Sequence, residues 1–377
     1  MIEFLEEFFK PNNPSFWVFI FLVFGLIIFF TTRIFATYAK FVYPNAKFEA
    51  MGNPFINEKK LNDLISLKNL ENFIENINSD KDLKISGEKI SELQNSLDEN
   101  FLKIVNMMRK DSSKKMDRFY DSYLLKYDYY LIKKFIKDKL REKELDENIL
   151  KRCFLEKTKK ILIQIINKDK SELINILEKN DFDADVINNI KEEKIDYLLL
   201  DICLDKQLIK EIKKTKVPYK CEKAKEKMLR TLIDVLNIKN ILRAKQRNYT
   251  KDYCKNLFLG EGQEIAKWLF NEMAEQDSVE QLVTRLEGTN YFDYIKDRIE
   301  EYNKSGTVQV FENAVDLAFL NIIKDISTEY YVTIGPSIRF IISKEYEIRN
   351  LKVISKGISE RVDSEIIKRN LIFEVPR

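Results

Sequence analysis

The hydrophobic pattern of the chain begins with an unbroken apolar run, FWVFIFLVFGLIIFF, from Phe16 to Phe30. The 22 residues between Lys10 and Arg33 carry no charge. At a helical rise of about 1.5 Å per residue, they are long enough to cross a hydrocarbon core of roughly 30 Å. Trp17 lies where an interfacial aromatic side chain is expected. The pattern predicts a single N-terminal transmembrane helix.

Two other interpretations of this run remain open. A cleaved signal peptide needs a basic region before the run and a small-residue cleavage site after it, whereas acidic residues precede it and bulky ones follow. A buried core helix is compatible with its 15 strictly apolar residues. For a spanning helix, one basic residue before the run and three soon after it (Arg33, Lys40 and Lys47) place the C-terminal bulk in the cytoplasm.

The rest of the chain carries the periodic pattern of amphipathic helices. No glycine occurs in residues 88–259 and no proline in residues 55–217, and Leu, Ile, Lys and Glu are abundant there. Only the short pieces Thr307–Phe311 and Leu371–Val375 have strand character. The expected fold class is therefore all-α, with one N-terminal transmembrane helix.

A search for internal repeats finds one helix three times. The segments DYYLIKKFIKDK from Asp128, DVLNIKNILRAK from Asp234 and EIRNLKVISKGI from Glu347 align without a gap, and their starts are 106 and 113 residues apart. Each begins with an acidic residue, has Leu or Asn at the fourth position, Lys at the sixth and a basic residue at the tenth. This spacing is that of three small domains.

The repeat and the apolar run together predict the domain organisation. A connector that contains Pro44, Gly52 and Pro54 is expected to separate the apolar helix from the body. The predicted parts are an N-terminal transmembrane anchor, 1–38, and three helical units, 39–146, 147–250 and 251–377.

The polar positions of the repeat form a candidate site. Residues three and four apart are neighbours on a helix, so the acidic, amide and basic positions share or flank one stripe. The stripe either supplies hydrogen bonds and ion pairs between helices or lines a common surface that receives a partner. The candidate partner-interface residues are Asp128, Lys133, Asp234, Asn237, Lys239, Arg243, Glu347, Arg349, Asn350 and Lys352.

Composition removes most catalytic chemistry. The sequence has no histidine, and hence no imidazole base, no imidazole metal ligand and no Ser-His or Cys-His nucleophile pair. It has no glycine-rich phosphate loop, and its four cysteines show no C-x-x-C spacing, as expected for reduced thiols in a cytoplasm. No catalytic residue, cofactor or metal site is predicted.

Charge gives one local signal rather than a global one. The 64 basic and 61 acidic residues leave a net charge of +3, so no nucleic-acid partner is predicted. The stretch from Lys206 to Lys255 is nevertheless notably basic. It is either solvated helix surface or a surface attracted to anionic lipid headgroups or an acidic partner.

The repeated helices also carry a resemblance to a known family. The runs IGPSIRFIISKEYEIRNLKVISKGI, from Ile334 to Ile358, and LIDVLNIKNILRAK, from Leu232 to Lys245, closely resemble the C subunit of archaeal A-type and bacterial V-type ATP synthases, a relative of the d subunit of the vacuolar ATPase. The likeness extends from about residue 40 to residue 371. It is most specific at Gly335, Pro336, Glu347, Arg349 and Asn350.

The resemblance implies a non-catalytic rotor part. It implies three similar helical domains in a funnel-like pseudo-threefold arrangement. Such a protein links the central-shaft subunits D and F to the membrane proteolipid (c/K) ring and transmits torque between ion transport and ATP synthesis or hydrolysis. The alternative is a membrane-anchored helical scaffold or ATPase assembly factor.

The apolar N-terminus departs from the usual family pattern, because the members generally begin near the equivalent of Phe41. A rotor part cannot drag a helix through lipid beside a fixed stator. The run from Phe16 to Phe30 is therefore expected to enter the central pore of the ring rather than the surrounding membrane lipid. The predicted location is the cell membrane, with a single N-terminal pass.

Overall fold

The computed structural model describes residues 8–52, 55–56, 58–79, 83–143, 147–166 and 168–372. These residues form helices and contain no strand, so the all-α prediction is confirmed. The predicted strand character of Thr307–Phe311 is wrong, because Gln309 opens a long helix in which Phe311 is fully buried. Leu371 and Ile372 are not in a strand either, and residues 373–375 lie outside the described residues.

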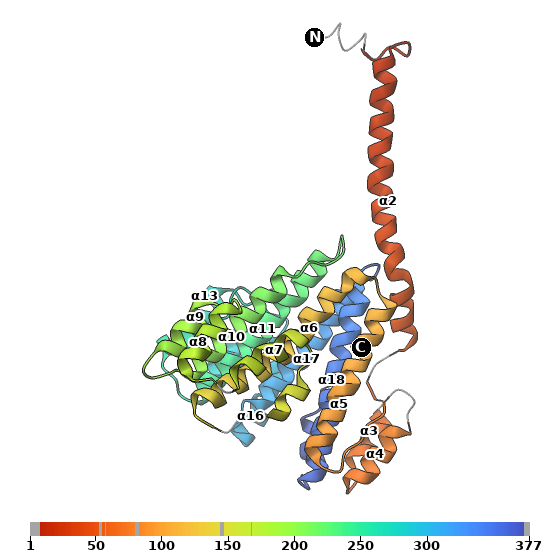
Figure 1. Cartoon of the computed structure of the whole chain (residues 1–377). Helices are drawn as coiled ribbons and strands as arrows, with labels where there is room; N and C mark the ends of the chain where they lie inside the picture. Colours follow the sequence, from red (N-terminus) through yellow and green to blue (C-terminus); the bar gives the residue numbers. More distant parts are fainter. Residues whose placement is uncertain are drawn as a thin grey trace.

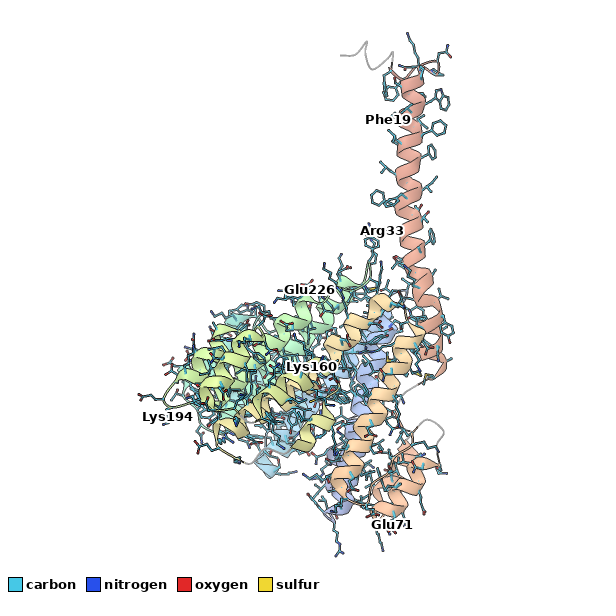
Figure 2. The ribbon with its side chains drawn as sticks, viewed as in Figure 1. Phe19, Arg33, Glu71, Lys160, Lys194 and Glu226 are labelled. Carbon is cyan, nitrogen blue, oxygen red and sulfur yellow. The ribbon has the colours of Figure 1, made fainter. Side chains whose placement is uncertain are left out.

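Helix α2 (Pro14–Ala50) is a single helix of 37 residues that projects from the body (Figure 1). Its N-terminus is capped: the Asn13 side chain accepts the N–H of Ser15 at 2.9 Å. Pro14 occupies the first turn, where the N–H that proline lacks would have no partner within the helix. The large apolar side chains of the run point outward around the helix (Figure 2).

The connector expected around Pro44 does not begin there. Helix α2 continues through Pro44 and ends at Ala50, and Gly52 with φ +73° follows. A proline in a helix interior costs about 3 kcal/mol, so packing has to offset it. Phe41 and Phe48, which flank Pro44, are 2% and 3% exposed, and their burial against the body supplies that packing.

The lower part of α2 is fastened to the body by two further contacts. The ring of Phe48 stacks on that of Phe340, with centroids 5.0 Å apart. Asn45 donates hydrogen bonds to the carbonyls of Tyr331 at 2.7 Å and Thr333 at 3.0 Å. The apolar run is therefore connected to the body through continuous helix rather than through a loose tether.

The body is organised around six long helices (Figure 1). They are α5 (Ile90–Asp111), α6 (Asp117–Leu140), α10 (Tyr197–Lys214), α11 (Glu222–Gln246), α17 (Gln309–Glu329) and α18 (Gly335–Ser359). Helix α6 packs against α10, α11 against α17, and α18 against both α17 and α5. The three repeated segments lie in α6, α11 and α18.

Short helices cover the long ones. They are α3 (Glu58–Ile65), α4 (Leu70–Asn78), α7 (Glu156–Ile165), α8 (Lys170–Lys179), α9 (Ala184–Lys191), α12 (Lys251–Lys255), α13 (Lys267–Glu275), α14 (Val279–Thr284), α15 (Phe292–Ile295), α16 (Ile299–Ser305) and α19 (Ser364–Arg369). The described residues also contain three 3-10 turns: η1 (Lys114–Met116) between α5 and α6, η2 (Glu147–Arg152) between α6 and α7, and η3 (Lys296–Arg298) between α15 and α16.

Five of the long helices meet at one small interior cavity. Its lining is Phe119, Ser122, Tyr123 and Lys126 of α6, Ile212 of α10, Met228 and Leu232 of α11, Phe319 of α17 and Ile342 of α18. Beside it, Lys126 donates to both oxygens of Glu345 at 2.7 and 2.6 Å, and the Tyr123 hydroxyl donates to the same carboxylate. The first and third repeated helices are thus joined directly.

Candidate functional site

Asp234, the first position of the second repeat, is fully buried on α11 and holds a loop. Its carboxylate accepts the N–H groups of Gln263, Glu264 and Ile265 at 3.0, 2.9 and 2.8 Å. Burial raises the pKa of Asp234 to about 6, and the three backbone hydrogen bonds limit that rise. Position 262 requires glycine, because a Cβ there would lie 1.7 Å from the Asp234 Oδ1 atom.

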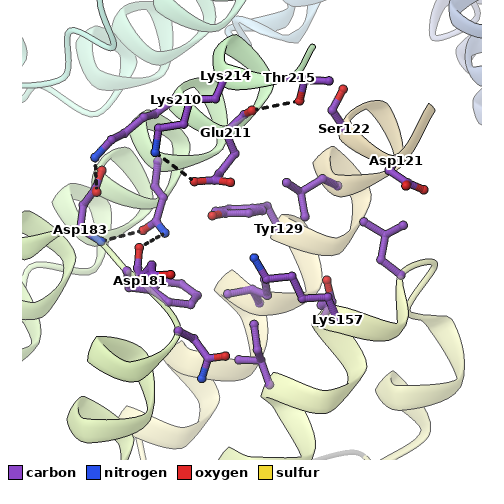
Figure 3. A pocket seen from close by; sticks show the side chains of 18 of the residues that line it. Asp121, Ser122, Tyr129, Lys157, Asp181, Asp183, Lys210, Glu211, Lys214 and Thr215 are labelled. Carbon is purple, nitrogen blue, oxygen red and sulfur yellow. Dashed lines mark hydrogen bonds and ion pairs between the residues drawn. The ribbon is translucent and has the colours of Figure 1, made fainter. Parts of the chain in front are cut away.

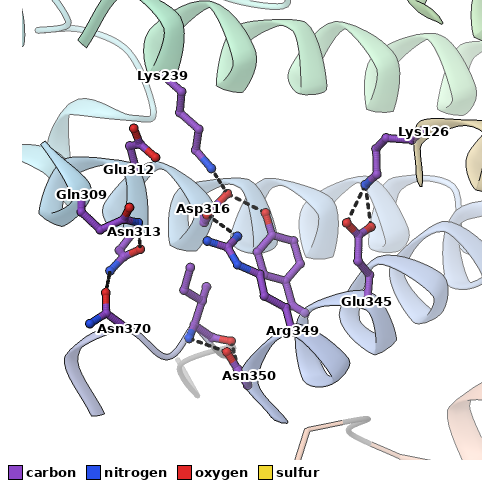
Figure 4. Close-up of polar contacts among 12 residues, drawn as sticks. Lys126, Lys239, Gln309, Glu312, Asn313, Asp316, Glu345, Arg349, Asn350 and Asn370 are labelled. Atoms are coloured by element: carbon purple, nitrogen blue, oxygen red, sulfur yellow. Dashed lines mark hydrogen bonds and ion pairs between the residues drawn. The ribbon is translucent and has the colours of Figure 1, made fainter. Parts of the chain in front are cut away.

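Asn237 and Asn350 occupy the fourth position of their repeats and hold backbone in the same way. Asn237 accepts the N–H of Leu259 at 2.9 Å and donates to the carbonyl of Gly260 at 3.0 Å. Asn350 accepts the N–H of Ile372 at 3.0 Å and donates to its carbonyl at 2.7 Å (Figure 4). The accepted N–H lies 22 residues after the asparagine in both cases.

Asp128 plays the corresponding part in the first repeat. Its carboxylate accepts the N–H groups of Phe154 at 2.8 Å and Leu155 at 3.0 Å, and burial raises its pKa. Glu347, in the third repeat, is 4% exposed and accepts a hydrogen bond from Lys344 at 2.8 Å. The acidic and amide positions are therefore buried, and Asp128, Asp234, Asn237 and Asn350 fix the segment that follows each repeated helix.

The basic sixth position of each repeat forms an ion pair with a different long helix. The pairs are Lys133 with Asp205 of α10, Lys239 with Asp316 of α17 and Lys352 with Asp98 of α5, each at 2.5 Å. Every pair crosses from one predicted unit to another. The basic tenth position adds a pair to another long helix in two cases, Lys137 with Asp201 at 2.7 Å and Arg243 with Glu312 at 2.5 Å, whereas Lys356 pairs locally with Glu360 at 3.8 Å.

Asp316 is the most connected of these acids (Figure 4). It is 1% exposed and accepts hydrogen bonds from Lys239 at 2.5 Å, Arg349 at 2.7 Å and the Tyr346 hydroxyl at 2.6 Å. Burial alone would raise its pKa, but the positive charges of Lys239 and Arg349 outweigh burial and hold the pKa below its ordinary value. Helices α11, α17 and α18 are held together at this carboxylate.

The ten candidate residues thus divide into an internal set and a partly exposed set. Arg243 and Arg349 keep side-chain exposures of 54% and 40% while paired with acids. The partner-interface role stays a prediction. The acids that pair with the repeat were not among the predicted residues, although Asp201 with Asp205 and Glu312 with Asp316 share a four-residue spacing that is visible when the long helices are aligned.

A cavity of 1120 Å³ lies between α6, α7, α10 and the segment before α9 (Figure 3). Tyr129 and Phe182 lie in its apolar part, and its rim is charged. Lys210 pairs with Asp183 at 2.5 Å and Lys214 with Glu211 at 3.7 Å. Because these charges neutralise one another, the cavity presents no excess of one sign to a charged ligand.

Within the described ranges, neither the acidic side chains nor the cysteines are arranged for metal binding or thiol reactivity. No group of three or more His, Cys, Asp or Glu side chains there is placed to hold a metal ion. The four cysteines are free thiols, and burial raises the pKa of Cys221 to about 12. A thiol with such a raised pKa is a poor nucleophile at neutral pH.

Helix α2 is the one helix of the described residues that is long and apolar enough to cross a membrane, by length and composition. Its most apolar window has a mean hydropathy of 2.5, and none of that window is buried within the protein. The run is therefore not a core helix of this chain.

The fold and the site define an all-helical protein whose repeated polar residues join helices and hold backbone and whose long apolar helix is left exposed. The family model for the ATP synthase (C/AC39) subunit matches residues 44–370. The chain belongs to this family. It is thus part of an ATP synthase complex that is associated with a membrane, and the resemblance drawn from the sequence is confirmed.

Curated relatives agree over almost the whole length. The C subunit of the A-type ATP synthase from Pyrococcus horikoshii is 25% identical over 355 residues, which cover 92% of this chain and 94% of that protein. The C subunit of the A-type ATP synthase from Methanocaldococcus jannaschii is 26% identical over 371 residues, which cover 92% and 90%. The family model begins at residue 44, so the apolar part of α2 lies outside the matched range.

Proposed function

We propose that the chain is a non-catalytic central-stalk component of an A/V-type ATP synthase. In this role it belongs to the rotor, links the central-shaft subunits D and F to the membrane proteolipid ring, and transmits torque between ion transport and ATP synthesis or hydrolysis. The family match over residues 44–370 is the observation that carries the proposal. The ion pairs between helices support it, because a body that transmits torque has to resist deformation.

The contacts also support the funnel-like pseudo-threefold arrangement. The sixth repeat position pairs α6 with α10 through Lys133, α11 with α17 through Lys239, and α18 with α5 through Lys352. Helix α5 precedes α6 in the first unit, so the third ion pair joins the last unit back to the first. Three equivalent pairs therefore link the units in a closed ring. The division into units 39–146, 147–250 and 251–377 is proposed on the same basis.

The coupling test compares two activities of one membrane preparation. In a strain without this chain, ATP-driven ion pumping by membrane vesicles is expected to be lost, while ATP hydrolysis by the detached catalytic head persists. Re-expression of the full chain is expected to restore pumping. Pumping that is unaffected by the deletion would contradict the rotor role.

For α2 we propose a single pass with the body on the cytoplasmic side and residues 16–30 inside the pore of the proteolipid ring. The exposed apolar surface of the run and its continuity with the packed part of α2 support this position. Photo-crosslinkers placed along residues 16–30 of the assembled complex are expected to capture the proteolipids of the ring. Capture of the stator or of lipid alone would contradict the pore position.

A membrane-anchored scaffold or assembly factor is the second candidate. The position of the apolar helix outside the family-matched range favours it, since an anchor added to the family fold would serve a protein that stays in the lipid. The chain would then be absent from intact ATPase preparations, or a second, soluble member of the family would occupy the stalk. Mass spectrometry of the purified complex distinguishes the two candidates.

A further inference from the structure

The loop between α10 and α11, residues 215–221, lies beside the end of the apolar run. Arg33 is the first charged residue after that run, and its guanidinium lies over the ring of Tyr219, 4.5 Å from the ring centroid. The loop accordingly rises next to α2 (Figure 1). If α2 spans a bilayer as proposed above, Arg33 marks the depth at which it leaves the hydrocarbon, and Tyr219 lies at the depth of the lipid headgroups.

The loop and its flanking turns carry an excess of exposed positive charge. The exposed lysines are Lys213, Lys214, Lys216, Lys220 and Lys223. The acidic residues among them and just beyond are Glu222 and Glu226, both exposed, and Glu211, just before them, pairs with Lys214 at 3.7 Å. Lys216, Lys220 and Lys223 form no ion pair within the described residues, so their charges are available to an anion from outside the chain.

The backbone of this loop is held in place from within. Lys225, which is 8% exposed, donates from Nζ to the carbonyls of Lys213 at 3.0 Å and Thr215 at 2.5 Å. Pro218 is buried, and Lys220 has the left-handed φ of +70°. A loop fixed in this way presents its lysines without the ordering cost of a flexible segment.

The fold itself does not require lysines at this place. Of the two equivalent connections, the one between α17 and α18, residues 330–334, reads Tyr-Tyr-Val-Thr-Ile and carries no charge. The one between α5 and α6, residues 112–116, carries Lys114 and Lys115, so lysines here vary between units that share the same helix pairing. A loop that only has to be solvated could equally well carry acidic and basic residues in similar numbers. The combination of lysines, an interfacial tyrosine and the headgroup depth set by Arg33 is instead the chemistry of a surface that binds anionic lipid.

We propose that residues 213–223 bind the phosphate groups of anionic phospholipids at the cytoplasmic surface of the membrane crossed by α2. This inference rests on the single pass proposed above, and it places the anionic lipid inside the ring, at the cytoplasmic mouth of the pore that α2 enters. Lys216, Lys220 and Lys223 contact the phosphates, and Tyr219 packs at the same depth beside Arg33. The contact fixes the distance between the membrane and the body at a second point in addition to α2.

The test uses the full chain reconstituted with equal parts of phosphatidylglycerol and phosphatidylcholine, followed by mild detergent extraction and mass spectrometry of the retained lipids. The wild type is expected to retain phosphatidylglycerol in preference to phosphatidylcholine. The triple variant K216Q/K220Q/K223Q is expected to lower that ratio at least tenfold, since each lysine near an anionic surface contributes on the order of fivefold. The control K160Q/K194Q/K304Q removes the same charge from exposed positions elsewhere on the body and is expected to leave the ratio unchanged.

Three outcomes would overturn the inference. Equal retention of the two lipids by the wild type, or an equal loss in the control variant, would show that the loop is ordinary solvated surface. Displacement of phosphatidylglycerol by inorganic phosphate at matched ionic strength would show an anion site without lipid selectivity. Carbonate extraction of the chain from the same vesicles tests the span separately, so that a chain that inserts without lipid preference contradicts this inference alone.

Discussion

The Asn350 side chain satisfies both backbone groups of Ile372: it accepts the N–H at 3.0 Å and donates to the carbonyl at 2.7 Å. Both residues are buried, at 5% and 3% exposure. A buried backbone N–H or C=O without a partner is costly, so this side chain supplies what a neighbouring strand or helix would otherwise supply. The end of the described chain is thereby fixed to α18.

Replacing Asn350 with leucine, the residue that the first repeat has at Leu131, is expected to lower the free energy of unfolding by about 1–3 kcal/mol. The leucine fills the space but leaves the N–H and C=O of Ile372 without partners. Chemical denaturation of the full chain in detergent measures the loss. Asn303→Leu, at an exposed position of α16, is the control and is expected to change stability by less than about 0.5 kcal/mol. Equal effects of the two variants would contradict the assignment.

Gly262→Ala is expected to destabilise the chain by about 1–3 kcal/mol, because the new Cβ would lie 1.7 Å from the Asp234 Oδ1 atom and the loop would have to move. The same change in an Asp234→Ala background is expected to cost much less, since the clashing oxygen is gone. A double-mutant cycle of unfolding free energies measures this coupling. Additive effects would show that Gly262 is needed for another reason.

The raised pKa of Asp234, about 6, predicts a specific pH dependence. The folded chain binds a proton at this group more tightly than the unfolded chain, whose ordinary value is 3.8, so this contribution to stability falls as pH rises from 4 to 6. Asp234→Asn removes the titration. The free energy of unfolding of the wild type minus that of the variant is therefore expected to increase as pH is lowered from 7 to 4. A constant difference across this range would contradict the raised pKa.

Asp316→Asn is expected to cost about 3–5 kcal/mol, because Lys239, with 12% side-chain exposure, would keep a buried charge without its carboxylate. The sign of the pH effect is opposite to that of Asp234. The lowered pKa of Asp316 gives stability that is present above 3.8 and is lost as pH falls through the folded pKa. Asp325→Asn, on the exposed face of the same helix, is the control and is expected to be nearly neutral.

The sequence alone was sufficient for the class of fold and for the repeated helix. The 3.6-residue periodicity and the scarcity of glycine and proline specify helices locally, and the three repeats lie in α6, α11 and α18 as aligned. The end of α2 was misjudged at Pro44. Proline is a local signal against a helix, whereas the packing of Phe41 and Phe48 that outweighs it comes from residues hundreds of positions away.

The partners of the candidate residues were out of reach for the same reason. Asp234 binds a loop about 30 residues on, and Lys352 pairs with Asp98, which is 254 residues before it. A sequence shows which side chains share a helix face, but not which distant segment that face meets. The repeated polar positions were visible in the sequence, but their contacts were not. The acidic and amide positions hold the following segment, whereas the basic positions pair with another long helix, so the two sets do not share one contact surface.

The attachment of α2 to the body gives the last prediction. Phe48→Ala removes a ring that is 3% exposed and stacked on Phe340, a loss worth about 3–5 kcal/mol in a core. Because few residues join α2 to the body, the loss is expected to detach the lower part of α2 rather than to unfold the chain. Hydrogen exchange of residues 41–50 is expected to accelerate on the order of 100-fold while α11 and α17 keep their protection.

Phe35→Ala provides the matched control for that measurement. Phe35 lies on the same helix, is 71% exposed and makes little contact with the body, so its removal is expected to leave the exchange of residues 41–50 unchanged. Faster exchange throughout the body in Phe48→Ala would instead place Phe48 in the global core. Local detachment has a functional consequence: if the helix has to turn with the body, ATP-driven pumping would fall in Phe48→Ala and persist in Phe35→Ala, because only a packed helix can follow the rotation of the body to which it is attached.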